Sequence, residues 1–89
     1  MSDSRVAVVK FGIEVENFLL TPVGRYLNSR AEEEIESAVE ELKRVNPRDE
    51  MGIRDIQTRI QVCERVLYWL GDAIREGRMA EEQLMSERD

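Results

Sequence analysis

The sequence contains no histidine, the residue that most often serves as a general base and as a metal ligand. It also has no glycine-rich phosphate loop after a strand, no cysteines at metal-ligand spacing and no nucleophile beside a base. These absences remove the usual patterns of catalysis and of cofactor binding. We therefore expect a protein that is not an enzyme and that holds no cofactor and no metal.

Cysteine and long apolar runs are also scarce. The single cysteine, Cys63, cannot form an internal disulfide, which is typical of a reducing compartment such as the cytoplasm. Its place on an apolar helix face predicts a buried, unreactive thiol. The apolar run from Val6 to Val9 is too short for a membrane span and is interrupted by Lys10 and Gly12. We predict neither a signal peptide nor a membrane segment.

Positive charge is in deficit, with 13 lysines and arginines against 19 acidic residues and a formal net charge of −6. Nucleic-acid binding depends on cations that displace counterions from phosphate, so a basic or neutral protein is the favoured partner. Charged residues make up 36% of the chain and apolar residues 42%, a mixture typical of amphipathic helices. The 89 residues predict one domain, residues 1–89, of a size that a second copy or a partner often completes.

The segment from Val6 to Leu20 has two interpretations. Phe11, Ile13 and Val15 alternate with polar residues and glycine as in a strand, whereas other apolar positions have helical spacing. We favour a short helix from about Val8 to Leu20, because the chain has no second strand to pair with.

Thr21 and Pro22 form the clearest helix start in the chain. Threonine can accept amide hydrogen bonds at a helix N-terminus, and proline suits the first helical position. The helix predicted from Pro22 ends near Val45. The segment Asn46–Asp49 then breaks the helix, because proline disfavours helical geometry in the residue before it, and Asn46 can cap the next helix.

The most regular amphipathic stretch runs from Asp49 to Gly77. It predicts a helix that ends at Glu76, with Gly77 in the left-handed conformation common after a helix. Because the connection before it is short, we predict an all-α fold: an antiparallel helical hairpin of two long helices, with a short N-terminal helix and a short C-terminal helical extension. Residues 1–5 and 85–89 are predicted to be frayed. The apolar positions of the stretch are Ile53, Ile56, Ile60, Cys63, Leu67, Leu70 and Ile74.

A second apolar stripe on the same helix is more than a two-helix hairpin can cover, and its further partner is either the Val6–Leu20 segment or another copy of the chain. Trp69 is its best anchor, because tryptophan is large and enriched in interface hot spots. Trp69 could instead pack in the core against Phe11 or Phe18, and both interpretations stay open. The candidate interface, which predicts a homo-oligomer or docking on another protein, comprises Val62, Val66, Tyr68, Trp69 and Ala73.

An acidic face is a second candidate site. Glu33, Glu36 and Glu40 share one side of the second helix and could bind a basic partner. A solvated helix face explains such a run more often, and glutamates that project into water make a poor metal site.

A third candidate site is the pair Arg54 and Arg65, which share a face that could contact phosphate or an acidic protein. The net charge and the absence of a short helix-turn-helix pattern give nucleic acid a low weight. Asp55 and Arg59 are four residues apart and are expected to form an ion pair along the helix.

The order of these features resembles small proteins encoded by tailed bacteriophages, over roughly residues 11–84. Those proteins are encoded among DNA-packaging and head-assembly genes. The resemblance implies a virion-assembly or packaging accessory in the host cytoplasm or with the virion, a small inhibitor of a host protein, or a nucleic-acid-binding packaging component. It rests on the residues 18–27 (FLLTPVGRYL), the glutamate and alanine run, Asn46–Asp49, Ile56-Gln57, Trp69-Leu70 and Gly77.

Overall fold

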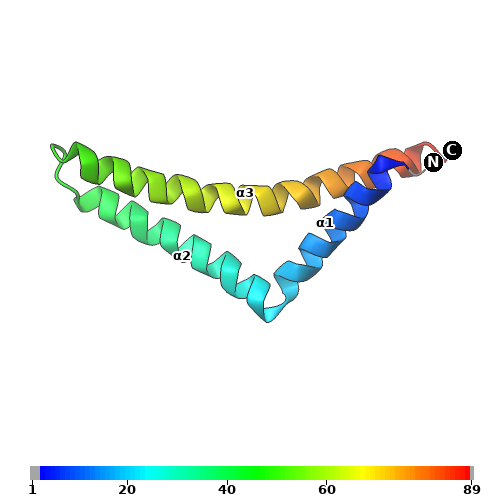
Figure 1. The fold of residues 1–89 in the computed structure, drawn as a ribbon, viewed down its shortest axis with the longest axis horizontal. Coiled ribbons are helices and arrows are strands. Elements are labelled where there is room, and N and C mark those ends of the chain that lie inside the picture. The colour runs from blue at the N-terminus through cyan, green and yellow to red at the C-terminus, as the bar shows by residue number, and fades with distance from the viewer. Residues whose placement is uncertain (1–2, 89) are drawn as a thin grey trace. The chain divides into compact units, whose positions relative to one another are not determined.

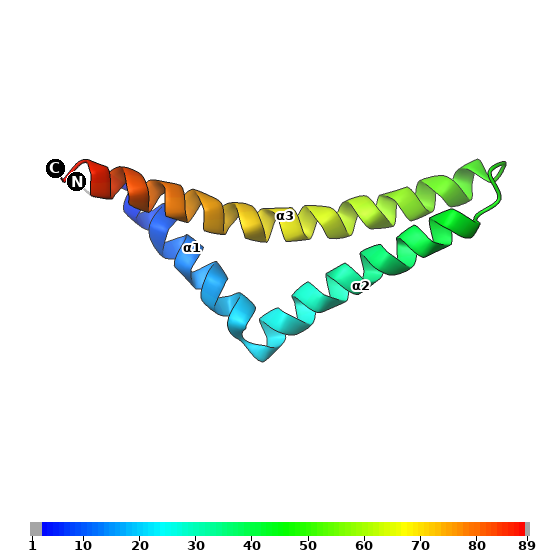
Figure 2. The ribbon, with the colours of Figure 1, turned by 180° about the vertical axis from the view of Figure 1, so that it is seen from behind.

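The computed structural model describes residues 3–88, which form three α-helices and no strand (Figures 1 and 2). α1 spans Ser4–Leu20, α2 spans Pro22–Arg44 and α3 spans Glu50–Ser86. The all-helical prediction is therefore confirmed. The chain divides into two compact units, and α3 contributes to both. Unit 1 is Met1–Arg25 with Trp69–Asp89, and unit 2 is Tyr26–Tyr68.

α1 shows that the ambiguous N-terminal segment is a helix. It begins at Ser4, because the carboxylate of Asp3 caps it by accepting a hydrogen bond from the Arg5 amide at 2.9 Å. The start predicted near Val8 is too late, since it followed the apolar spacing and ignored this cap. Of the ends predicted to be frayed, residues 1, 2 and 89 lie outside the described residues, whereas Arg5 and Met85 are helical.

A single residue, Thr21, joins α1 to α2. Its hydroxyl donates a hydrogen bond to the Phe18 carbonyl at 2.6 Å and accepts one from the Gly24 amide at 3.0 Å, so it serves both helix ends. α2 begins at Pro22, as the Thr21-Pro22 pair predicted. A Cβ atom at Gly24 would overlap the Phe18 carbonyl, which explains glycine in the first turn of α2.

Two polar side chains stabilise the turn between α2 and α3 and the start of α3. The side chain of Asn46 accepts a hydrogen bond from the Arg48 amide at 2.9 Å, and Asp49 accepts one from the Gly52 amide at 2.9 Å. Asp49 therefore caps α3, and the prediction that Asn46 does so is wrong. Asn46 instead stabilises the turn that precedes the cap.

The predicted end of α3 at Gly77 is also wrong, because the helix continues to Ser86. No glycine in the described part of the chain has a positive φ. Gly77 is buried against α1, and a Cβ atom on it would lie 3.1 Å from the Cα of Gly12. Glycine at this position permits the close approach of two backbones and does not end the helix.

Each unit has a thin core. Among residues 3–88, the buried apolar side chains are Val15 and Ala80 in unit 1, and Ala38 and Ile56 in unit 2. Cys63 is half-buried, so the prediction of a fully buried thiol is wrong. Within these residues, no helix combines the length and the apolarity that a membrane span requires.

Candidate functional site

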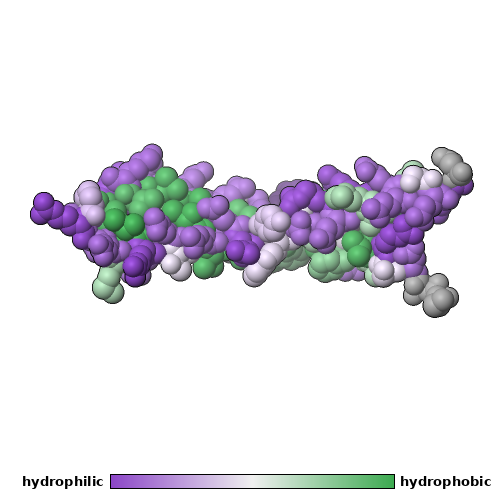
Figure 3. Space-filling view, turned by 90° about the horizontal axis from the view of Figure 1, so that it is seen from above, coloured by the Kyte–Doolittle hydropathy of each residue, from purple (hydrophilic) through white to green (hydrophobic). Residues whose placement is uncertain are grey.

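An open groove in unit 1 is lined mainly by apolar side chains of two helices. It lies between α1 and α3 and has a volume of about 390 Å³. Two aromatic side chains on its wall are exposed, Phe11 by 57% and Trp69 by 62%. Figure 3 shows hydrophobic side chains at the surface of both units, among polar ones. The groove residues are Ala7, Val8 and Phe11 of α1 with Trp69, Asp72, Ala73 and Glu76 of α3.

The backbone crossing of α1 and α3 positions this groove. A Cβ atom on Gly12 would lie 2.9 Å from the Ala73 carbonyl oxygen, so the two helices touch without a side chain between them. On α3 the small residues Ala73, Gly77 and Ala80 recur at helical spacing and make room for this approach. Phe11 precedes the crossing residue by one position and lines the groove.

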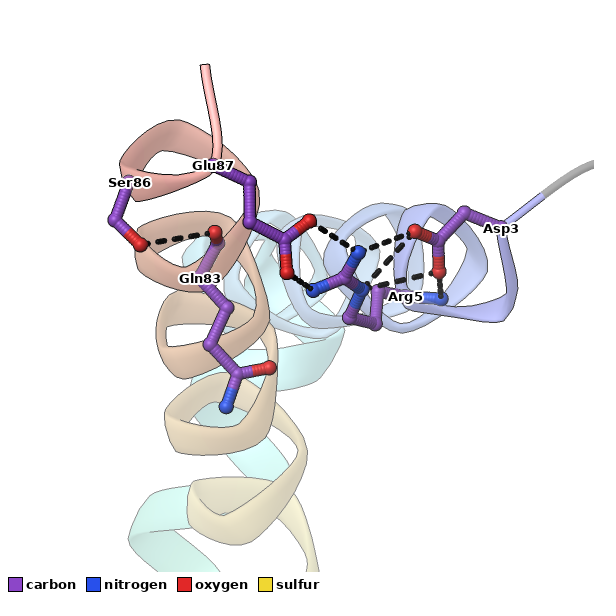
Figure 4. A network of polar contacts seen from close by, with 5 residues as sticks. All are labelled: Asp3, Arg5, Gln83, Ser86 and Glu87. Atoms are coloured by element: carbon purple, nitrogen blue, oxygen red, sulfur yellow. Dashed lines mark hydrogen bonds and ion pairs between the residues drawn. The ribbon is translucent and has the colours of Figure 1, made fainter. Parts of the chain in front are cut away.

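Ion pairs hold the helix ends of unit 1. Figure 4 shows the Arg5 guanidinium between two carboxylates, with Asp3 at 2.6 Å and Glu87 at 2.7 Å. The hydrogen bonds from Arg5 hold the pKa values of both carboxyl groups below their ordinary values, and the two carboxylates raise the pKa of Arg5. A second pair joins Arg78 to Glu16 at 2.9 Å. α1 is therefore tied to α3 by one ion pair beside the glycine crossing and by another near the helix ends.

The groove has the chemistry of a docking surface. Its lining is apolar apart from Asp72 and Glu76, and Asp72 pairs with Arg75 at 3.3 Å. Among the described residues, no group of three or more histidine, cysteine, aspartate or glutamate side chains could hold a metal ion. Apolar side chains of another polypeptide match such a lining better than a polar small molecule does.

The structure places the five residues of the predicted interface on α3, divided between the two units. Trp69 and Ala73 line the groove of unit 1, and Trp69 is far too exposed to be a core residue. Val62, Val66 and Tyr68 belong to unit 2 and are exposed by 57%, 41% and 57%. That these residues contact a partner stays a prediction.

The predicted acidic face lies on α2 in unit 2. Glu33, Glu36 and Glu40 are exposed, and Glu40 accepts a hydrogen bond from Lys43 at 3.0 Å. Two neighbouring glutamates turn toward α3 instead, where Arg59 pairs with Glu34 at 2.7 Å and with Glu41 at 2.6 Å.

Arg59 thus corrects the prediction of an ion pair with Asp55 along α3. Its guanidinium reaches α2, because two carboxylates there offer more hydrogen bonds than one neighbour on the same helix. The hydrogen bonds from Arg59 lower the pKa of Glu34. Arg54 and Arg65 are exposed on α3, and Arg65 lines an open hollow of about 490 Å³ with Gln61, Glu64 and Tyr68.

Sequence reasoning named Phe11 only as a possible core contact of Trp69, and it missed Gly12 as the crossing residue. The spacing of Ala73, Gly77 and Ala80 could have indicated a close helix contact. It could not have decided between the N-terminal segment and another copy of the chain as the partner.

The chain matches no family model, no curated protein and no solved structure. The resemblance to phage proteins therefore remains an expectation, and function is inferred from the surfaces that the two units expose.

Proposed function

We propose that this chain is a non-enzymatic helical interaction protein. It binds protein through the groove of unit 1 and through the exposed α3 residues Val62, Val66 and Tyr68 of unit 2. One observation carries the proposal: all five aromatic side chains of the chain are exposed. The exposed fractions are 57% for Phe11, 37% for Phe18, 65% for Tyr26, 57% for Tyr68 and 62% for Trp69.

Burial of the exposed aromatic surface by a partner would contribute a large favourable binding free energy. The exposed part of Trp69 amounts to roughly 150 Å² and would contribute up to roughly 4 kcal/mol if a partner covered it. Aromatic residues are the ones that dominate protein interfaces. A partner that covers Phe11 and Trp69 together would therefore gain most of what the groove offers.

Within this proposal, the antiparallel hairpin of α2 and α3 is the scaffold, and the setting is virion assembly or DNA packaging in a tailed phage. The resemblance of residues 11–84 to phage proteins suggests that setting. The partner is then a second copy or a larger phage assembly in the host cytoplasm or the virion. An acidic, all-helical chain with exposed apolar anchors is suited to a role through contact.

Amine crosslinking tests the proposal, because the chain has only two lysines and they mark the two units. Lys10 is next to Phe11 in unit 1, and Lys43 is in unit 2. In phage-infected cells, mass spectrometry should find protein crosslinks through Lys10. Trp69→Ala should remove them while the helix content by circular dichroism stays unchanged.

Met51→Ala is the matched control for that experiment. Met51 is exposed by 77%, lies on α3 and belongs to unit 2, so its truncation should leave the Lys10 crosslinks intact. Lys10 crosslinks that persist in a folded Trp69→Ala variant would contradict the proposal.

A second candidate function is a small acidic inhibitor that covers a basic surface of a host protein. The observation in its favour is the exposed acidic face of α2. Arg59 forms ion pairs with Glu34 and Glu41, whereas Glu33 and Glu36 are exposed to solvent. Host binding through this face should weaken as salt screens the charges. A triple variant of Glu33, Glu36 and Glu40 to glutamine should abolish it, and salt-insensitive binding would exclude this function.

A further inference from the structure

We infer that the side of unit 2 opposite the Arg59 ion pairs is a docking surface for a basic amphipathic helix of another protein. This surface, the unit 2 flank, consists of apolar side chains of α2 and α3. It is separate from the surfaces that carry the proposed function and adds a further one. The flank residues are Ile35, Val39 and Leu42 of α2 with Ile53 and Ile60 of α3.

The Arg59 ion pairs show which residues share the flank. Arg59 of α3 pairs with Glu34 and Glu41 of α2, so these three side chains lie on one side of the contact between the helices. The buried residues Ala38 and Ile56 mark the contact itself. Each residue advances an α-helix by about 100°. Counted from Ala38 on α2 and from Ile56 on α3, the five flank residues therefore lie on the side away from Arg59.

The unit 2 flank is only partly covered within this chain. Val39 is exposed by 37%, and the other four flank residues are half-buried. Two packed helices bury one stripe each and leave the sides of those stripes open. Figure 3 shows hydrophobic side chains gathered in unit 2, toward the turn between α2 and α3. Two neighbouring apolar rows, each about 10 Å long, form a surface on which a third helix can pack.

The rim of the unit 2 flank is acidic. Glu32 on α2 and Glu50 and Glu64 on α3 border the apolar residues, and all three are exposed. Within the described residues, none of these three glutamates forms an ion pair. Lys43 also lies on this rim, but it pairs with Glu40 at 3.0 Å. The rim therefore presents three carboxylates that no cation neutralises.

This charge favours a basic partner over a second copy. A second copy would bring three more glutamates to the same rim, and like charges that face each other oppose association. A helix with apolar residues on one face and lysine or arginine on both sides of that face would pair with the rim on α2 and on α3. Farther around the helices, the charges of Glu36 and Arg54 offset each other.

A designed peptide tests the unit 2 flank directly. The probe is a fluorescently labelled helical peptide of about 18 residues, or five turns, with leucines on one face and lysines on both sides of them. One control peptide replaces the lysines by glutamates, and the other replaces the leucines by glutamines. The probe should bind the whole chain at micromolar concentration, and each control should bind at least roughly tenfold more weakly. Absence of binding by the probe, or equal binding by either control, would overturn the proposal.

Amide NMR spectra of the labelled chain place the contact. The probe should change the amide shifts between Ile35 and Leu42 and between Ile53 and Ile60. Changes confined to unit 1 would overturn the proposal. Concentration-dependent changes at the same amides without any peptide would also overturn it, because they would assign the flank to a second copy.

Val39→Gln and Met51→Gln form a matched pair of variants. Both remove an exposed apolar side chain of unit 2, exposed by 37% and 77%. Met51 is two residues before Ile53 and therefore lies about 160° away from it around α3. Val39→Gln should raise the Kd of the probe by roughly tenfold, and Met51→Gln should leave it unchanged. Equal effects in variants that circular dichroism shows to be helical would overturn the placement on the flank.

A second matched pair tests the acidic rim at constant net charge. Glu32→Gln with Glu64→Gln removes two rim charges, and Glu14→Gln with Glu82→Gln removes two exposed charges of unit 1. The rim variant should raise the Kd roughly fivefold at low salt, with a smaller effect at high salt. Equal losses in both double variants would show attraction to net charge alone and overturn the role of the rim. The Lys10 crosslinks test the proposed function independently of all these measurements.

Discussion

In unit 1 the helices meet at glycine, whereas in unit 2 they meet at alanine and isoleucine. Gly12 and Gly77 bring the backbones of α1 and α3 into contact, with the Arg78–Glu16 ion pair beside this point and the Arg5–Glu87 pair near the helix ends. In unit 2, Ala38 and Ile56 are the buried residues, and Arg59 bridges to two glutamates of α2. The close backbone contact at glycine therefore distinguishes unit 1 from unit 2.

The largest effect expected from this difference follows Gly12→Ala. The new methyl group would lie 2.9 Å from the Ala73 carbonyl oxygen, so backbone must move. Overpacking outweighs the gain in helix propensity, and we expect a net loss of about 2 kcal/mol in the free energy of unfolding. Urea denaturation followed by circular dichroism measures this loss.

Gly71→Ala is the matched control on α3. Its Cβ atom would meet only the end of the flexible Arg75 side chain, at 3.2 Å. This variant should gain up to about 1 kcal/mol from helix propensity. Equal effects of the two variants would show that the close crossing does not determine the stability of unit 1.

A smaller effect is expected in unit 2 from Arg59→Met. This change keeps the aliphatic packing of the side chain and removes the pairs with Glu34 and Glu41. The pairs are partly exposed, so the loss should be smaller than for Gly12→Ala and should shrink at high salt. Thermal unfolding at low and high salt measures it, and a loss independent of salt would indicate packing as its cause.

The smallest effect is the acid sensitivity of the ion pairs in both units. Arginine hydrogen bonds lower the pKa of Asp3 and Glu87 in unit 1 and of Glu34 in unit 2. Below about pH 4 the unfolded chain binds protons that the folded chain still excludes, so stability falls as pH falls through the lowered values. Arg5→Gln should reduce this pH dependence in denaturation profiles, and an unchanged profile would exclude a contribution from Asp3 and Glu87.

The start of α2 was readable from sequence because its cap is local. Thr21 and Pro22 mark the start of α2 without any knowledge of the rest of the fold. The role of Gly77 was not readable, since a glycine after an amphipathic stretch indicates a helix end unless another backbone occupies the space beside it. That backbone is α1, 65 residues earlier in the chain at Gly12.

The candidate site was predictable only where it depends on local sequence spacing. The spacing of Val62, Val66, Trp69 and Ala73 identified a face of α3 with surplus apolar surface. Phe11 joins that face only through the crossing of α1. Arg59 likewise pairs with Glu34 and Glu41 because α2 packs against α3, although Asp55 is closer to Arg59 in sequence.

The Arg5–Glu87 pair also bears on the order in which the chain can fold. It joins residues 82 positions apart, and the Arg78–Glu16 pair spans 62, whereas Arg59 reaches Glu41 and Glu34 across 18 and 25. Longer loops cost more entropy to close, and contacts of short sequence separation form faster. We therefore expect α2 to pair with α3 first, an order that hydrogen exchange during refolding would verify. During synthesis, α1 is made first, yet its ion pair with Glu87 cannot form until α3 has also been made.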